Sequence, residues 1–315
     1  MAMSARKIMR TLKSVFVMFT LMSFVAASCE EAPVETDPVD SNTSQIDVFA
    51  AAQSSGDLQS PDLDEASGLV ASRSNDLYLW THNDSGGSPS LFLISTVGAD
   101  SGRFVLSGAN NVDWEDIAIG PGPDAGIQYL YVGDIGDNRA VRDNLTIYRL
   151  PEPDLNDQNI PATQNLTNIE SIDFIYSNGA RDAESLMVDP LTNDIYVVSK
   201  RESQVGLYVL PFPQATNEMD TAEFLINIPF TMFTAGDISS DGSEILIKNY
   251  FNIYYWQRAN GQTIAEALAI LPQKVGYRPE PQGEAICFSN KGDGFFTLSE
   301  MDSNQPVPIL FYRRN

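Results

Sequence analysis

Apolar and polar positions alternate in short blocks along residues 60–315, and a polar turn separates each block from the next. Turn-forming pairs such as Ser74-Asn75, Thr192-Asn193 and Asp241-Gly242 interrupt runs rich in Val, Ile, Leu, Tyr and Phe. Helical periodicity is nearly absent, and residues 264–271 are the one doubtful stretch. The pattern therefore predicts an all-β domain over residues 60–315.

A small or acidic residue followed by an apolar strand occurs five times in this domain, at residues 65–70, 113–118, 182–187, 234–239 and 282–287. With equivalent positions at Ser67, Glu115, Glu184, Gly236 and Glu284, the intervals are 48, 69, 52 and 48 residues. Periods near 50 residues with several strands each are typical of a β-propeller. We predict a single β-propeller of five blades, closed by an N-terminal strand near residues 46–49. Six blades is the alternative, if the long second interval contains an extra unit.

In a propeller, the innermost strand of each blade lines a central channel, so the five equivalent positions should converge on one axis. Three of them are glutamates, and carboxylates about 5 Å apart repel by about 3 kcal/mol per pair at an effective dielectric of about 20. Either some of these acids are protonated, or a cation lies among them and removes that repulsion. The alternative is that these acids cap strand entrances or pair with Arg and Lys.

Oxygen ligands of this kind suit Ca²⁺, whereas one histidine and no clustered cysteines disfavour zinc. The predicted ligand set is Ser67, Glu115, Glu184, Glu284 and either the Gly236 backbone carbonyl or Asp237.

The N-terminus predicts export. Four cations precede residues 14–27, an apolar stretch too short to span a bilayer comfortably. Residues 26–29 (Ala-Ala-Ser-Cys) resemble a bacterial lipobox, which would make Cys29 the lipidated first residue; an ordinary cleaved signal peptide is the alternative. We expect a signal peptide over 1–28, an acidic tether over 29–59 and the propeller over 60–315, anchored to the outer membrane of a bacterial cell envelope, on its periplasmic or exposed side.

The net charge of the chain limits the kinds of molecule that it can bind. Removing the four cations of the signal peptide leaves 15 basic and 42 acidic residues, a net charge of about −27. Nucleic acid is a poor partner for such a chain, and divalent cations are good ones. We expect a monomer that binds an anionic small molecule or a surface partner. Cys287 lies in an apolar strand and is expected to be a buried hydrophobe.

The five equivalent positions, in chain order, resemble the central calcium shell of the calcium-activated nucleotidases (apyrases), which are five-bladed propellers. The likeness extends to His82-Asn83-Asp84, to residues 130–133 with Gly136, to residues 200–203 and to Lys248, and covers the blade cores from about residue 67 to 286. It departs at Gly236, where the family has Ser, and at residues 137–139, where the family has Lys-Glu-Trp. Short markers of this kind also occur in other propellers, including the β-propeller phytases.

The resemblance implies hydrolysis of nucleoside di- and triphosphates. Calcium would polarise a phosphoryl oxygen, Arg201 and Lys248 would neutralise developing charge, and Asp84 or Glu184 would orient the attacking water. Three further residues would shape the substrate pocket: His82, Lys200 and Arg139. The alternative is a non-catalytic propeller, stabilised by calcium, that binds a protein, peptide or glycan.

Overall fold

The computed structural model describes residues 48–156, 159–300 and 306–315. Over these residues the chain forms β-strands and one short helix, α1 (Ile264–Leu268), which begins at Thr263 with a capping box to Glu266. The helix lies in the doubtful stretch of the sequence. The prediction of an all-β domain is confirmed.

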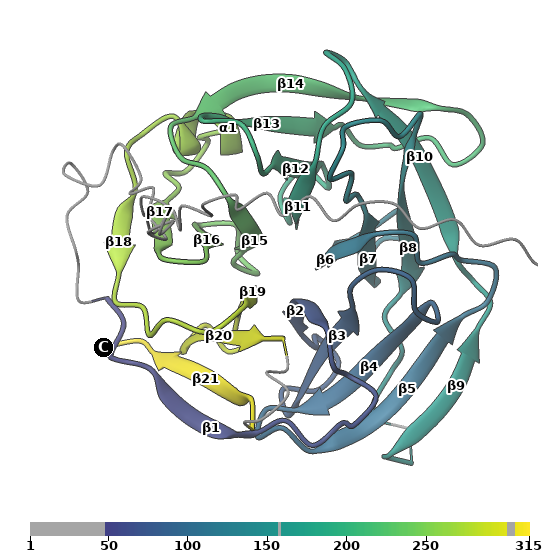
Figure 1. The fold of residues 1–315 in the computed structure, drawn as a ribbon, viewed down its shortest axis with the longest axis vertical. Helices are drawn as coiled ribbons and strands as arrows, with labels where there is room; N and C mark the ends of the chain where they lie inside the picture. Colours follow the sequence, from purple (N-terminus) through teal and green to yellow (C-terminus); the bar gives the residue numbers. More distant parts are fainter. Residues whose placement is uncertain (1–47, 157–158, 301–305) are drawn as a thin grey trace, which may run out of the picture. The chain divides into compact units, whose positions relative to one another are not determined.

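The strands form five antiparallel meanders, in which most strands pair with a neighbour in sequence (Figure 1). The first meander contains β2 (Ala66–Ala71), β3 (Tyr78–Asn83), β4 (Ser90–Ser95) and β5 (Asp100–Leu106). The second contains β6 (Trp114–Pro121), β7 (Gln128–Asp134), β8 (Leu145–Pro151) and β10 (Glu170–Tyr176). The third contains β11 (Ala183–Val188), β12 (Ile195–Ser199), β13 (Val205–Leu210) and β14 (Asp220–Ile228). The fourth contains β15 (Phe233–Ile238), β16 (Glu244–Asn249), β17 (Ile253–Gln257) and β18 (Gln273–Val275). The last contains β19 (Gly283–Phe288), β20 (Gly294–Ser299), β21 (Pro308–Arg313) and β1 (Gln53–Asp57).

The first strands of the meanders contact one another in a closed cycle, β2 to β6 to β11 to β15 to β19 and back to β2. Figure 1 shows these inner strands around the centre, with the later strands of each meander further out. This is the arrangement of a β-propeller, in which the inner strands surround an axis.

The long second interval of the repeat is explained by one extra strand. After β8 the chain leaves the second meander, and β9 (Ala162–Leu166) pairs in parallel with β5 at the outer edge of the first. The chain then returns to form β10, which also pairs in parallel with β14 of the third meander. In the described part of the chain, the added length therefore extends a neighbouring sheet instead of building another meander.

An N-terminal strand closes the last meander, as predicted, but further along the chain than residues 46–49. β1 pairs antiparallel with β21, and Phe49 forms only an isolated bridge with Arg314. The residues of β1 are Gln, Ser, Ser, Gly and Asp, so no apolar alternation marks this strand. Its pairing rests on the backbone groups of the β21 edge. The predicted signal peptide, Cys29 and the first part of the tether lie outside the described residues.

The core is divided between neighbouring meanders. Alternate residues of an inner strand point to opposite faces, so that Ile117 and Ile119 pack against the first meander while Ala118 packs against the third. Buried clusters of the same kind fill the other spaces between consecutive meanders. Because both faces of each inner strand are buried, these strands lack the alternation of a half-exposed strand, and segments such as 117–119 and 186–188 are entirely apolar.

Candidate functional site

A β-bulge lies near the start of every inner strand. In each pairing of a meander's first and second strands, one residue of the first strand is skipped in the ladder. The skipped residues are Gly68, Glu115, Glu184, Thr234 and Glu284. A bulge re-aims the side chain of its extra residue, and here it gives the three glutamates their common position in the repeat.

This register corrects two of the five equivalences drawn from the sequence. Gly68, not Ser67, and Thr234, not Gly236, occupy the bulge position. The Ser67 hydroxyl donates to the Glu115 carbonyl at 2.5 Å, and the Thr234 hydroxyl donates to the Gly283 carbonyl at 3.3 Å. Both hydroxyls thus tie one inner strand to the next.

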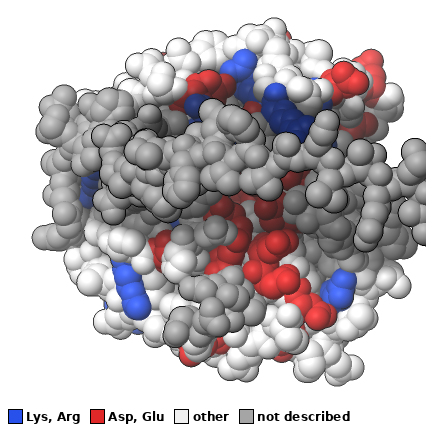
Figure 2. All heavy atoms as spheres, in the orientation of Figure 1, with Lys and Arg blue, Asp and Glu red and all other residues white. Residues whose placement is uncertain are grey.

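Carboxylates gather at this end of the axis, which we call the acid mouth. Oxygens of Asp84, Asp113 and Glu115 lie within 4.8 Å of one another, and so do oxygens of Glu115, Asp182 and Glu184. Glu115 belongs to both groups. Figure 2 shows Asp and Glu side chains gathered near the centre of this face.

The first of these groups has weaker compensation than the second, because Arg142 acts on Asp113 and Lys200 on Glu115 without forming an ion pair with either. Glu115 is only 4% exposed, and the described residues give neither its carboxylate nor that of Asp113 a hydrogen bond or an ion pair. Burial, followed by the nearby carboxylates, raises the pKa of Glu115 well above its usual range. Burial and the charge of Asp113 raise the pKa of Asp84 to about 6, and its Oδ1 atom has no hydrogen-bond partner in the described part of the chain.

The second group is partly neutralised. Lys200 forms a buried ion pair with Glu184, and its ammonium donates to the Tyr250 hydroxyl at 3.2 Å. Tyr250 in turn donates to Glu284 at 2.6 Å. Burial raises the pKa of Glu184 to about 8, although the charge of Lys200 opposes the shift. Next to Glu284, burial and the Glu284 charge raise the pKa of Glu300 to about 8.

Asp182 is held from two sides. Its Oδ1 atom accepts the Asp137 backbone N–H at 2.8 Å, and its Oδ2 atom accepts Arg201 Nε at 2.5 Å. The Arg201 guanidinium also donates to Asn138, and its side chain remains 45% exposed. Arg201 therefore stands at the rim of the acid mouth with part of its surface open to solvent.

Gly136 makes room for the first group of carboxylates. Its N–H donates to the Asp113 carbonyl at 3.1 Å. A Cβ atom on Gly136 would overlap Glu115 Oε1 and lie 2.5 Å from the Asp113 carboxylate. The Asp113 and Glu115 side chains thus pack directly against the backbone of the loop after β7.

Below the acid mouth, the Asp116 carboxylate accepts hydrogen bonds from backbone N–H groups. Its Oδ2 atom accepts N–H groups of Leu186, at 2.9 Å, and of Gly236, at 3.3 Å, and its Oδ1 atom accepts the Ile117 N–H at 2.9 Å. The inner strands have one unpaired edge that faces the axis, and this carboxylate satisfies donors on three of them.

Asp237, predicted as an alternative calcium ligand, has the same role. Its two oxygens accept the N–H groups of Ile238 and Phe288, each at 2.8 Å, and it belongs to neither acid group. Gly236, the other alternative, donates its N–H to Asp116. Of the predicted ligands, Glu115 and Glu184 share one acid group. Glu284 belongs to neither group and is linked to the mouth through Tyr250, and the Asp237 carboxylate lies apart from them.

Four residues predicted to contact substrate lie elsewhere or already have internal partners. His82 is fully buried with its ring edge-on to Trp114, and burial lowers the pKa of His82 to about 4. Lys248 is also fully buried, where it donates to the Gly283 carbonyl, and burial lowers its pKa to about 8. Arg139 is exposed on the loop after β7, and Lys200 is held by its buried pair.

Asp113, Asp182 and Tyr250 belong to the site but were not singled out from the sequence. The sequence contains a signal for Asp113 and Asp182, because each stands two residues before a glutamate of the acid mouth, in the pattern Asp-x-Glu. Tyr250 had no such signal, since it reaches Glu284 and Lys200 only through the fold.

Within the described residues, no helix is both long and apolar enough to cross a membrane. No protein-family model matches the sequence, and no curated protein matches it. Among solved structures, the chain is similar to the PQQ-bound aldose sugar dehydrogenase of Streptomyces coelicolor, with a TM-score of 0.45 and 8% sequence identity. That match covers 84% of this chain and 98% of the dehydrogenase.

Proposed function

We propose that the acid mouth binds a calcium ion in a five-bladed propeller. The observation that carries this proposal is Glu115, which is 4% exposed and whose carboxylate has no compensating donor in the described structure. A buried carboxylate is ordinarily paired, hydrogen-bonded or bound to a metal. A cation against Asp84, Asp113 and Glu115 supplies the missing charge.

The donor set favours calcium. Asp84, Asp113 and Glu115 offer only oxygens, and Asp84 and Asp113 are partly exposed, which leaves space for waters to complete an irregular shell. Glu184 and Asp182 already have cationic partners in Lys200 and Arg201, so they support the ion from the far side of Glu115. This centre differs from the ligand set expected from the sequence, which placed the ion among the three bulge glutamates.

The five-blade count rests on the meanders. Each contributes one inner strand with one bulge, and each space between consecutive meanders holds a buried cluster. We assign one blade to each meander.

Calorimetric titration of the purified, chelator-treated protein with calcium chloride tests the site. We expect one saturable event that Glu115→Gln weakens at least about tenfold, because a charged ligand is lost. Glu223→Gln, which alters an exposed acid on β14, is the matched control and should bind as the unaltered protein does. Equal binding by Glu115→Gln would exclude this centre.

Calcium-dependent hydrolysis of nucleotides is the second candidate, and Arg201 favours it. The Arg201 side chain is partly exposed to solvent at the rim of the acid mouth, where it donates to Asp182. From this position its guanidinium could also contact a phosphate. Lys200 and Lys248 have internal partners and would not approach a substrate without breaking those contacts.

Phosphate release from nucleoside diphosphates, with calcium and with chelator, decides between catalysis and binding. Calcium-dependent turnover that Arg201→Gln lowers and Arg313→Gln retains would support hydrolysis, because Arg313 is exposed on the outer strand β21. Absence of turnover in a protein that binds calcium would favour the non-catalytic propeller. We propose an outer-membrane anchor at Cys29 for either function.

A further inference from the structure

A cavity of about 290 Å³ lies among the turns that follow the inner strands, away from the acid mouth. Its walls come from the C-terminal ends of β6 and β15, the start of β7 and the residues after β2 and β11. The apolar part of the lining includes Ile119, Pro121, Pro190 and Ile238. Because the bulges lie at the starts of the inner strands, this cavity lies toward the opposite ends of those strands.

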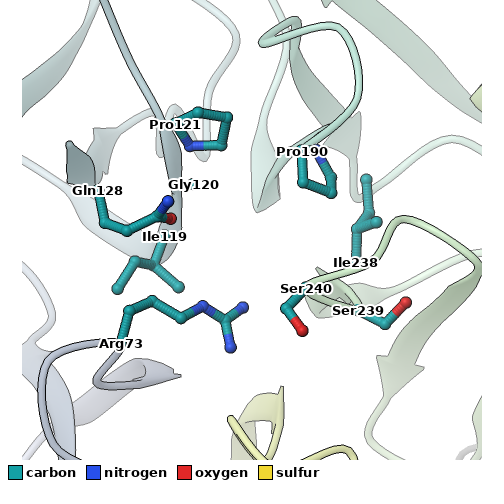
Figure 3. Close-up of a pocket in the computed structure, with 9 residues that line it drawn as sticks. All are labelled: Arg73, Ile119, Gly120, Pro121, Gln128, Pro190, Ile238, Ser239 and Ser240. Atoms are coloured by element: carbon teal, nitrogen blue, oxygen red, sulfur yellow. The ribbon is translucent and has the colours of Figure 1, made fainter. Parts of the chain in front are cut away.

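One positively charged side chain, that of Arg73, faces this cavity. Figure 3 shows the Arg73 guanidinium reaching from one side toward Ser240, with Ile119 and Ile238 on neighbouring walls. Arg73 is the charged residue among those that line the cavity, in a chain whose formal net charge is −23.

The Arg73 side chain is oriented by its neighbours. Its backbone N–H donates to both oxygens of Glu152, at 3.1 and 3.2 Å, and its Nη1 atom donates to Asn290 Oδ1 at 3.1 Å. Asn290 is fixed in turn by a bond from its Nδ2 atom to Asp76 at 2.6 Å. These contacts use one N–H of the guanidinium, and among the ion pairs of the described residues none includes Arg73.

We propose that this cavity binds a small organic monocarboxylate through Arg73. A guanidinium presents parallel N–H donors that match the two oxygens of a carboxylate. The Ser240 hydroxyl and the Gln128 amide provide further donors, and Ile119 and Ile238 suit a short hydrocarbon chain.

Size and charge select this class of ligand. The volume is at the small end of ligand pockets, which span about 300–1,000 Å³. A single guanidinium balances one negative charge, and the carboxylates of Glu152 and Asp237 are close enough to interact with Arg73, so that a dianion such as phosphate would be repelled. This inference does not depend on the calcium site.

An NMR titration of the protein in metal-free buffer, with sodium butyrate as the probe, tests the proposal. We expect saturable shifts of the Ser239 and Ser240 amides, with binding at least about tenfold weaker for butyramide, which has the same shape without the charge. Inorganic phosphate should bind more weakly than butyrate. Equal binding of butyrate and butyramide, or tighter binding of phosphate, would overturn the assignment.

Two variants locate the site. Arg73→Gln should weaken butyrate binding at least about tenfold, whereas Arg313→Gln, exposed on the outer strand β21 and outside the cavity lining, should not change it. Ser240→Asp places a carboxylate beside Arg73 on an exposed turn and should abolish binding without disturbing the fold. Retention of butyrate binding by either cavity variant would show that the ligand lies elsewhere.

Discussion

Two sets of buried carboxylates occupy the axis of this propeller, and they differ in what surrounds them. Asp116 and Asp237, within the channel, accept backbone N–H groups with both oxygens. Glu115, one residue before Asp116, accepts none in the described structure. Adjacent residues of one strand thus have opposite roles, since the bulge turns Glu115 toward the other acids while Asp116 faces the free edges of β11 and β15.

The comparison shows that burial alone does not mark a binding site. Burial is the main cause of the raised pKa at Glu115, Asp116 and Asp237 alike. Their partners distinguish them, because a carboxylate surrounded by N–H donors completes the backbone, whereas one surrounded by other carboxylates must either hold a proton or be neutralised by a cation.

The largest loss of stability is expected when a carboxylate that accepts backbone N–H groups is removed. Asp116→Ala removes the acceptor of three N–H groups, two of which belong to other inner strands. Each buried donor left without a partner costs about 1–3 kcal/mol, so we expect the free energy of unfolding to fall by on the order of 3 kcal/mol. Urea denaturation measures the loss, with Glu223→Ala as the exposed control that should change little. A loss below about 1 kcal/mol would remove the structural role assigned to Asp116.

The next effect is a pH dependence of the metal-free protein. The pKa of Glu184 rises from 4.5 to about 8 on folding, and that of Asp237 from 3.8 to about 7. The folded protein therefore holds more protons than the unfolded chain between the paired values, and its stability falls as pH rises through that range. His82 has the opposite effect, because its pKa falls from 6.5 to about 4, but most of that contribution arises below pH 6.5 and it levels off about one pH unit above that value.

Urea denaturation between pH 6.5 and 8, in chelator, isolates the acids. We expect the free energy of unfolding to decrease by on the order of 2 kcal/mol over this interval, and calcium to oppose the decrease because it favours the ionised carboxylates. A flat profile in chelator would indicate that the mouth glutamates are fully ionised without a metal.

A smaller effect of opposite sign to that of Asp116→Ala is expected at Glu115. Glu115→Gln removes an acid that, without metal, must either ionise beside other carboxylates or hold a proton at a pKa well above its usual range, so the metal-free protein should gain about 1 kcal/mol of stability at pH 8. The same variant should lose the increase in melting temperature that calcium gives to the unaltered protein. Destabilisation of the metal-free form would mean that Glu115 has a structural partner.

Much of this architecture is predictable because its signals are local. The apolar runs and turn residues indicate strands, and the recurrence near 50 residues indicates the propeller and places Glu115, Glu184 and Glu284 at one position of the repeat. The pairing register of the inner strands is harder to predict from the sequence. A bulge leaves the apolar run unchanged, so alignment of those runs displaced Ser67 by one residue and Gly236 by two.

The partners of the site residues were not predictable, because they depend on contacts between meanders. Asp237 resembles a ligand in sequence, yet its oxygens are used by Ile238 and by Phe288 of the next inner strand. Lys248 resembles a phosphate-binding cation, yet the fold buries it against the Gly283 carbonyl. The pairings of Asp237 with Phe288 and of Lys248 with Gly283 join residues 51 and 35 positions apart, and nothing in either local sequence indicates them.

The smallest expected change in stability comes from Gly136, which tests whether the ion lies against Asp113 and Glu115. In Gly136→Ala the new Cβ atom overlaps Glu115 Oε1 and crowds the Asp113 carboxylate, so both side chains must move. Their ends are flexible, and we expect a stability cost below about 1 kcal/mol but calcium affinity lowered about tenfold, since the shell loses its geometry. Gly87→Ala is the matched control, because a Cβ atom there meets open space. Calorimetric titration of both variants with calcium separates the outcomes. Unchanged calcium affinity in Gly136→Ala would place the ion away from Asp113 and Glu115, nearer Glu184 and Glu284. A loss of affinity in Gly136→Ala alone assigns the ion to the unpaired carboxylates that distinguish the mouth from the channel below.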